Sequence, residues 1–197
     1  MSVAAKDPAG WRVQPFDMRM TTDDDALARA AGDGDRDAFA ALLGRHYDRL
    51  FAFAMRLTGQ RSEAEDLTQD ICLALPSKLR GFRGEARFTT WLYRVAVNAA
   101  HDRRRRAATH ARAADGWGDW EVARRAADSE TRAATDWLAQ AMGTLKPDLR
   151  DTAVLILAEE LTQAEAASVL GISEGTVAWR MSQVKSALRA RAAEDME

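Results

Sequence analysis

Apolar residues recur every three or four positions along most of the chain, which is the spacing of helices that bury one face. The first stripe predicts a long helix with Asp35 or Asp37 as its N-cap and Gly59 just past its end. Its apolar members are Phe39, Leu42, Leu43, Tyr47, Leu50, Phe53, Ala54 and Leu57. Such a stripe buries one side of the helix in a core.

Two more helices are predicted to follow this one. The sequence 62–65 is a capping box that opens the second helix, and Pro76 is expected to stop it. After a loop over 77–87, Thr89 or Thr90 begins the third helix. The apolar positions of the third helix are Phe88, Trp91, Leu92, Val95, Ala96 and Ala99, and its opposite stripe holds Arg94, Asn98, His101 and Arg105. The third helix therefore has one apolar and one polar face.

Changes of pattern divide the chain into two helical parts. Residues 1–22 lack a helical period and are expected to form a flexible tail, whereas 23–106 carry the first domain. From 107 to 131 the pattern dissolves into Ala, Arg, Asp and Gly, so this stretch is interpreted as a linker. A second helical domain is predicted over 132–197. The expected fold class is all-α, with two small helical domains joined by a flexible linker.

Two short helices joined by a tight turn are predicted near the C-terminus. A capping box at 162–165 opens the first helix, Gly171 ends it, and Ser173 caps the second. The inward stripe of the second helix is Ile172, Val177, Met181, Val184 and Leu188, its outward side holds Gly175, Ala178, Trp179, Ser182, Gln183 and Ser186, and its basic residues include Lys185, Arg189 and Arg191. An ordinary helical hairpin would share this turn. The polar outward side and the basic end favour a helix-turn-helix that enters the major groove of DNA.

Composition narrows this picture. The 197 residues are 47% hydrophobic and 29% charged, as expected for a globular protein with a core. A single cysteine, Cys72, excludes an internal disulfide, and no apolar run approaches the length of a membrane span. We therefore expect a cytoplasmic protein without membrane insertion. The formal net charge of −2 looks unsuited to DNA, but it is the sum of separate acidic and basic stretches.

The most basic stretch is 94–112, where six arginines stand against one aspartate. Arginine donates paired hydrogen bonds to phosphate, so this stretch is a candidate nucleic-acid contact, although a solvated helix end has the same composition. Asn98 lies on the same face, and the preceding loop is expected to expose Phe82. An exposed ring beside an amide suits the reading of an unstacked base. A buried anchor of the loop is the alternative role for Phe82.

Acidic residues line the outer face of the second predicted helix. Glu63, Asp66 and Asp70 share this face with Gln69, and both a solvated surface and a docking surface for a basic protein remain open. Paired carboxylates also bind Mg²⁺ or transfer protons, but no convergent His, Lys or phosphate loop accompanies them. The three histidines lack the spacing of metal ligands. No catalytic residue, metal or cofactor is predicted, and the protein is not expected to be an enzyme.

Several short motifs occur in a fixed order along the chain. They are Gly34-Asp35 followed by Ala38-Phe39 and Leu42, then Ala64 to Asp70 (AEDLTQD), Phe82-Arg83-Gly84, Phe88 to Asn98 (FTTWLYRVAVN), and Leu170 to Val177 (LGISEGTV). Together, over 23–106 and 134–191, they resemble the extracytoplasmic-function (ECF) sigma factors of bacterial RNA polymerase. The first four resemble sigma region 2, and the last resembles the helix-turn-helix of region 4.

The resemblance implies a transcription initiation factor that binds core RNA polymerase and directs it to promoters. Region 2 would recognise and help to melt the minus-10 element, and region 4 would recognise the minus-35 element. The implied minus-10 contacts are Phe82, Arg94, Asn98, Arg103, Arg105 and Arg106, the implied minus-35 contacts are Ala178, Trp179, Ser182, Gln183 and Lys185, and the implied polymerase contacts are Asp66, Gln69 and Asp70. Many members carry a basic residue at the position of Ala178, so minus-35 readout here is expected to depend on DNA shape and phosphates.

The partners implied by the resemblance are the clamp and flap regions of core polymerase, promoter DNA and an anti-sigma factor. A stand-alone helix-turn-helix regulator is the alternative function. It accounts for 134–191 but assigns no role to the acidic helix or to the pair Phe82 and Asn98. A metal-dependent nuclease that uses Glu63, Asp66 and Asp70 is a third hypothesis.

Overall fold

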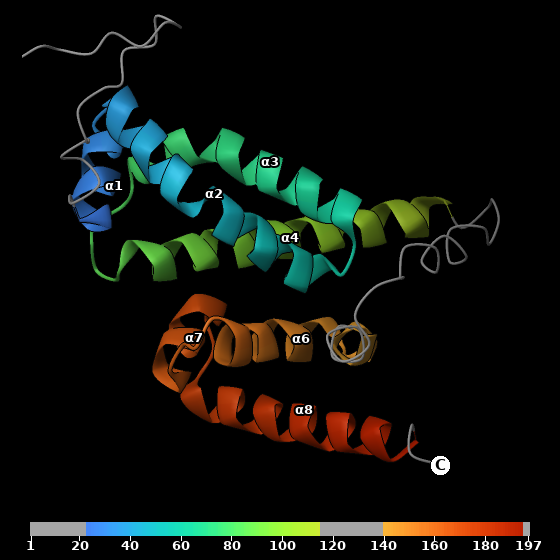
Figure 1. The fold of residues 1–197 in the computed structure, drawn as a ribbon. Coiled ribbons are helices and arrows are strands. Elements are labelled where there is room, and N and C mark those ends of the chain that lie inside the picture. The colour runs from blue at the N-terminus through green and yellow to red at the C-terminus, as the bar shows by residue number, and fades with distance from the viewer. Residues whose placement is uncertain (1–22, 115–139, 195–197) are drawn as a thin grey trace, which may run out of the picture.

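The computed structural model describes residues 23–114 and 140–194, and within these ranges the protein consists of helices without a strand. The main elements are α1 (Asp24–Gly32), α2 (Arg36–Thr58), α3 (Arg61–Leu79), α4 (Phe88–Ala114), α6 (Pro147–Ala153), a π-helical turn (Val154–Ala158), α7 (Gln163–Leu170) and α8 (Glu174–Glu194). Figure 1 shows α1 to α4 as one group, with α6 to α8 lying alongside as a second. The predicted all-α class is confirmed. The predicted tail, 1–22, and part of the predicted linker, 115–131, lie outside the described residues.

Helix α2 forms the centre of the first group, and both of its predicted ends are confirmed. The carboxylate of Asp35 accepts the backbone N–H groups of residues 37 and 38, at 2.9 and 3.0 Å. Gly59 ends the helix with a φ of +73°, a left-handed conformation that glycine adopts without strain. The apolar stripe between these ends packs against α1 and α3, with Leu50 and Phe53 fully buried, but its predicted member Tyr47 is exposed.

Helix α3 differs from its predicted boundaries at both ends. It begins at Arg61 after an N-cap at Gln60 that makes no side-chain capping bond, so the predicted capping box is wrong. It also continues through Pro76 to Leu79. The last turn is held by packing, because Leu79 is fully buried and its carbonyl lies against Gly32, where a Cβ atom would come within 2.5 Å of the oxygen. This tertiary contact outweighs the backbone hydrogen bond that proline removes.

Helix α4 begins at Phe88, one or two residues before the predicted start at Thr89 or Thr90, and a residue of α1 holds its first turn. The backbone N–H of Phe88 donates to the carboxylate of Asp25 on α1, at 2.6 Å. Asp24 on the same helix binds α2 through Arg45 and His46, each at 2.8 Å. Burial raises the pKa of Asp24, but the hydrogen bonds and charges of these two partners outweigh burial and leave that pKa below its usual value. Helix α4 then continues to Ala114, beyond the predicted domain end at 106.

The second group begins, in the described residues, with a short helical segment that leads into α6. Pro147 occupies the first turn of α6, where its missing N–H removes no helical hydrogen bond. The π-helical turn follows α6 directly and ends before Glu160, which has a φ of +55°. Helices α7 and α8 then pack on each other and on α6. None of the helices in the described ranges is long and apolar enough to span a membrane.

Candidate nucleic-acid interface

The polar stripe of α4 is exposed, as its periodicity predicts. Arg94 and Asn98 stand one helical turn apart, and both side chains face solvent. Leu92, Val95 and Val97 are buried around them, so the stripe rests on a packed helix. A guanidinium group and an amide group placed side by side can donate to phosphate and bond to a base edge.

Phe82 is not the exposed ring that the loop composition suggested. Its side chain is only 7% exposed and packs edge-on against Phe88 and Trp91, with ring centroids 6.1 and 5.5 Å away. The predicted exposure is therefore wrong, because the loop is short and the first turn of α4 offers two aromatic rings to cover. The alternative role, an anchor for the loop, is the one this packing supports. A contact between Phe82 and DNA stays a prediction.

A cavity of about 470 Å³ lies between this loop and α4. Arg83 from the loop and Trp91 and Arg94 from α4 contribute to its walls, and Ser168 and Val169 of α7 close another side. Its volume falls within the range of ordinary ligand pockets, and its charged lining consists of Arg83, Arg94 and Glu85, with Arg83 4.0 Å from Glu85.

The four consecutive arginines of α4, residues 103–106, lie in different surroundings. Arg103 is turned toward α3 and pairs with Asp70 at 2.5 Å and Asp66 at 3.2 Å. Arg104 faces the second helical group, whereas Arg105 and Arg106 are exposed, with Arg105 also paired to Asp102 at 3.1 Å. Sequence periodicity alone does not separate these four neighbours.

The acidic face of α3 is exposed, as predicted, and it forms ion pairs with an arginine of α4. Asp66 and Asp70 remain 65% and 54% exposed while they hold Arg103, and Gln69 between them is also exposed. The structure thus joins a residue predicted to bind DNA with two predicted to bind polymerase. Within residues 23–114 and 140–194, no three His, Cys, Asp or Glu side chains are grouped so that they could hold a metal ion.

The predicted helix-turn-helix is present with the capping groups that its sequence indicates. Thr162 and Glu165 form a reciprocal capping box at the start of α7, and hydrogen bonds from Thr162 lower the pKa of the Glu165 carboxyl. Gly171 turns the chain with a φ of +66°, and the Ser173 hydroxyl accepts the N–H of Thr176 at 3.1 Å. The turn is therefore fixed by local hydrogen bonds on both sides.

Helix α8 buries the predicted stripe and exposes the predicted outward side. Val177, Met181 and Val184 are buried, whereas Ala178, Trp179, Ser182, Gln183 and Lys185 are exposed. Trp179 is 60% exposed, an unusual state for a large apolar ring. The Ser182 hydroxyl donates to the carbonyl of Trp179 at 2.7 Å, so Gln183 carries the exposed amide of this face. One apolar ring, one amide and basic residues near the end of the face are suited to contact bases and phosphates in a groove.

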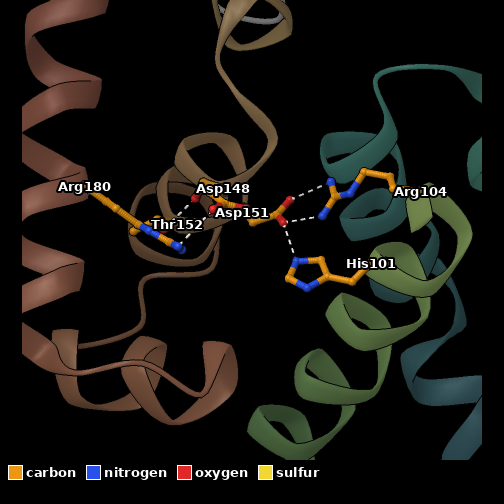
Figure 2. A network of polar contacts seen from close by, with 6 residues as sticks. All are labelled: His101, Arg104, Asp148, Asp151, Thr152 and Arg180. Atoms are coloured by element: carbon orange, nitrogen blue, oxygen red, sulfur yellow. Dashed lines mark hydrogen bonds and ion pairs between the residues drawn. The ribbon is translucent and has the colours of Figure 1, made fainter. Parts of the chain in front are cut away.

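Two buried carboxylates between the helical groups had no signature in the sequence. Figure 2 shows Asp151 of α6 reaching Arg104 and His101 of α4, while the nearby Asp148 pairs with Arg180 of α8. Glu159 binds two arginines of α2 and the Tyr93 hydroxyl of α4. Burial, and then the Glu159 carboxylate, raise the pKa of Tyr93 far above its usual value. These pairs join residues distant in the sequence, so no local pattern could have revealed them.

Comparison with known proteins decides the family. Residues 42–110 match the family model of Sigma-70 region 2, and residues 135–188 match that of Sigma-70 region 4. The ECF RNA polymerase sigma factor SigM of Mycobacterium tuberculosis is 36% identical over 88% of this chain and 86% of its own length. The chain belongs to the ECF sigma factors. The sigma factor CnrH of Cupriavidus metallidurans is 30% identical over 88% of this chain and 96% of its own length.

Solved sigma factor structures share the fold. RpoE of Bartonella quintana, crystallised with the anti-sigma factor NepR, superposes with a TM-score of 0.66 at 26% identity over 79% of this chain and 96% of its own. CnrH in complex with the cytosolic domain of CnrY gives a TM-score of 0.64 at 28% identity, over 87% and 98% of the two chains. The protein is therefore a DNA-binding transcription initiation factor of the ECF group, with its region 2 match falling within α2 to α4 and its region 4 match covering α6, α7 and most of α8.

Proposed function

We propose that this ECF sigma factor directs core RNA polymerase to promoters by reading the minus-10 element with α4 and its preceding loop, and the minus-35 element with α8. The observation that carries the proposal is the exposed pair Arg94 and Asn98, one helical turn apart on α4, with the exposed Arg83 in the preceding loop. An exposed amide and an exposed guanidinium one helical turn apart suit one flipped base and its phosphate. Unstacking a base costs about a few kcal/mol, which these contacts offset.

In region 4, the outward side of α8 enters the major groove at the minus-35 element. Gln183 offers its amide to a base edge, Trp179 contacts apolar groups such as thymine methyls, and Lys185 reaches the backbone. With one amide and one ring, base-specific bonds are few. Phosphate contacts and DNA shape therefore supply much of the affinity at this element.

Docking on polymerase uses the acidic face of α3. Asp66, Gln69 and Asp70 present two carboxylates and an amide to a basic surface of the polymerase clamp, and Arg103 is displaced from them as that surface approaches. An anti-sigma factor is a further partner, a proposal supported by two structural relatives that were each solved with an anti-sigma protein or a fragment of one.

Run-off transcription with core polymerase tests the proposal. We expect the purified protein to stimulate transcription from promoters of its own genome, and no stimulation at any of them would refute it. Asn98→Ala should weaken open-complex formation by about 1–3 kcal/mol, the value of one base contact, while binding to core polymerase is unchanged. Asp66→Arg should do the reverse, and Asp48→Arg, the same charge change on an exposed site of α2, serves as its control.

Equal loss of core binding in the Asn98 and Asp66 variants would contradict the division of roles between α4 and α3. Specific binding to promoter duplex in the absence of polymerase would favour a stand-alone helix-turn-helix regulator instead. Gel-shift titration with the purified chain at 0.15 M salt measures this directly.

A further inference from the structure

Helix α1 lies ahead of residues 42–110, the part of the chain that matches the region 2 family model. Leu27, Ala28 and Ala31 bury one side of α1 in the core, where the helix packs on α2 and α3. The loop 80–87 joins α3 to α4, and Figure 1 shows this connection running past α1. Three residues of α1 outside its buried side contact this loop or its ends.

The first two contacts are close approaches of backbone. At the start of the loop, the backbone of Gly32 lies so near Leu79 that a Cβ atom would come within 2.5 Å of the Leu79 carbonyl oxygen. In the middle of the loop, a Cβ atom on Gly84 would come within 2.9 Å of the guanidinium of Arg29. Gly84 also has a φ of +71°, which glycine adopts without strain. The chain therefore follows α1 closely at both points.

The third contact lies where the loop ends and α4 begins. The carbonyl of Arg87 accepts the N–H of Trp91 at 3.0 Å, which makes Arg87 the N-cap of α4. An arginine side chain has no acceptor, so it leaves the first N–H groups of the helix to other partners. The Asp25 carboxylate of α1 accepts the N–H of Phe88 at 2.6 Å, and its charge favours the positive end of the helix dipole. Asp25 thus caps α4 from another helix.

These three residues form one stripe on α1. Asp25, Arg29 and Gly32 stand at positions i, i+4 and i+7, the spacing of neighbours on a helix face. The loop meets them in reverse order, so it runs antiparallel along the stripe. Within the loop Phe82 is buried, whereas residues 80, 81 and 83–87 are exposed. The position of the loop therefore depends on one buried ring and on this stripe.

The stripe matters because the proposed minus-10 contacts come from two elements. Arg83 belongs to the loop, with a side chain that is 82% exposed, whereas Arg94 and Asn98 belong to α4. The junction that Asp25 holds lies between them in the chain. A strand that contacts both elements binds more tightly when the loop is already ordered, because binding then does not have to order it.

We propose that Asp25, Arg29 and Gly32 are positioning residues for minus-10 recognition, which fix the loop 80–87 against the start of α4. Asp25 has the largest part, because it joins α1 to the first turn of the helix that carries Arg94 and Asn98. The fixing of the loop follows from the contacts above, whereas its effect on promoter reading rests on the proposed function.

Hydrogen exchange of the full chain, measured by mass spectrometry, tests the fixing of the loop. In Asp25→Ala the peptide that contains Phe88 should exchange about fivefold faster, the factor that corresponds to the loss of one helix cap. Peptides of α2 and α3 should keep their wild-type rates. Asp25→Asn keeps an acceptor oxygen and should restore most of the protection.

Asp23→Ala is the matched control, because Asp23 is exposed, stands two residues away and makes no side-chain capping bond. It should exchange like the wild-type chain. Arg29→Ala, at an exposed site that leaves the Asp25 bond in place, should speed exchange over 80–87 and guards against a folding defect in the Asp25 variant. Wild-type exchange over 80–91 in both folded variants, or the same increase in Asp23→Ala, would overturn the proposal.

Holoenzyme assembled from core polymerase and each variant tests the effect on promoter reading. The probe is the single-stranded minus-10 segment of the non-template strand from a promoter that the wild-type holoenzyme transcribes. Asp25→Ala should bind core polymerase as the wild-type chain does, while the affinity of its holoenzyme for the probe falls about fivefold. Asp25→Asn should restore that affinity. Loss of core binding equal to the loss of probe binding would show a general structural role and overturn the positioning role.

The two measurements also separate the proposals. A loosened loop with unchanged affinity for the probe would overturn the effect on minus-10 reading while the fixing of the loop stands. No stimulation of transcription by the wild-type chain would refute the proposed function, and hydrogen exchange would still decide whether α1 fixes the loop.

Discussion

Replacement of Phe82 by alanine separates an anchoring role from a base-stacking role. A phenylalanine side chain buries about 150–250 Å². At about 25 cal/mol per Å² this burial stabilises the fold by about 4–6 kcal/mol. Alanine keeps part of that surface, and Phe→Ala in cores commonly costs about 3–5 kcal/mol. Because the exposed loop that carries Phe82 can collapse onto Phe88 and Trp91, we expect the free energy of unfolding to fall by about 3 kcal/mol.

Urea unfolding followed by circular dichroism at 222 nm measures this loss as the change in the free energy of unfolding. Tyr47→Ala is the control, because Tyr47 is 47% exposed and its removal should cost less than about 1 kcal/mol. A loss of under about 1 kcal/mol for Phe82→Ala would refute the buried position of the ring. Equal losses in both variants would do so as well.

Phe82→Leu adds the functional half of the test. Leucine preserves most of the apolar burial but has no flat face on which a base can stack. If the ring acts as an anchor, the leucine variant should form open complexes at nearly the wild-type rate under conditions where it is fully folded. A tenfold or larger loss in this folded variant would show that the ring leaves its packed position to hold a base.

Two further predictions concern stability. Gly32→Ala should destabilise the protein by about 1–2 kcal/mol, because the new Cβ would lie 2.5 Å from the carbonyl oxygen of Leu79 and this strain exceeds the gain of about 1 kcal/mol in helix propensity. Gly44→Ala is the control: its new Cβ would have nothing within 4 Å, so it should stabilise the protein by about 1 kcal/mol. The urea midpoints of the two variants measure the difference. Because the pKa of Asp24 is lowered in the folded protein, its contribution to the free energy of unfolding is fully present above its unfolded pKa of about 3.9 and is lost as pH falls through the folded value. The difference in free energy of unfolding between wild type and Asp24→Asn should therefore narrow from pH 5 to pH 3. A difference that widens would contradict the pairing of Asp24 with His46.

Features with local causes were predictable from the sequence. The ends of α2 at Asp35 and Gly59, and the turn at Gly171, follow from hydrogen bonds and backbone angles within a few residues. The exposed side of α8 follows from the 100° step of the helix, which places Trp179 and Gln183 opposite the buried stripe. In each case the residues that predict the feature lie within one or two helical turns of the feature itself.

Features with distant causes were not predictable. Pro76 normally ends a helix, but the packing of the next turn against α1 keeps α3 intact. The start of α4 depends on Asp25, which is 63 residues away, and the burial of Phe82 depends on rings that only the fold brings near. The partners of Asp151 lie 47 and 50 residues away on α4. A periodic pattern carries no information about such pairs.

The arginine run shows why residue type alone does not assign a role. Arg103 and Arg104 are neighbours, and each holds a carboxylate at 2.5 Å. The aspartates that hold Arg103 are more than half exposed, so that contact contributes at most about 1 kcal/mol and is screened within about 8 Å at physiological salt. A basic protein surface can displace it at little cost. Asp151 is buried, and salt screens its pair with Arg104 far less. Burial of the carboxylate, and not the arginine, therefore determines which side chain of the run is available to a partner and which one holds the two regions together.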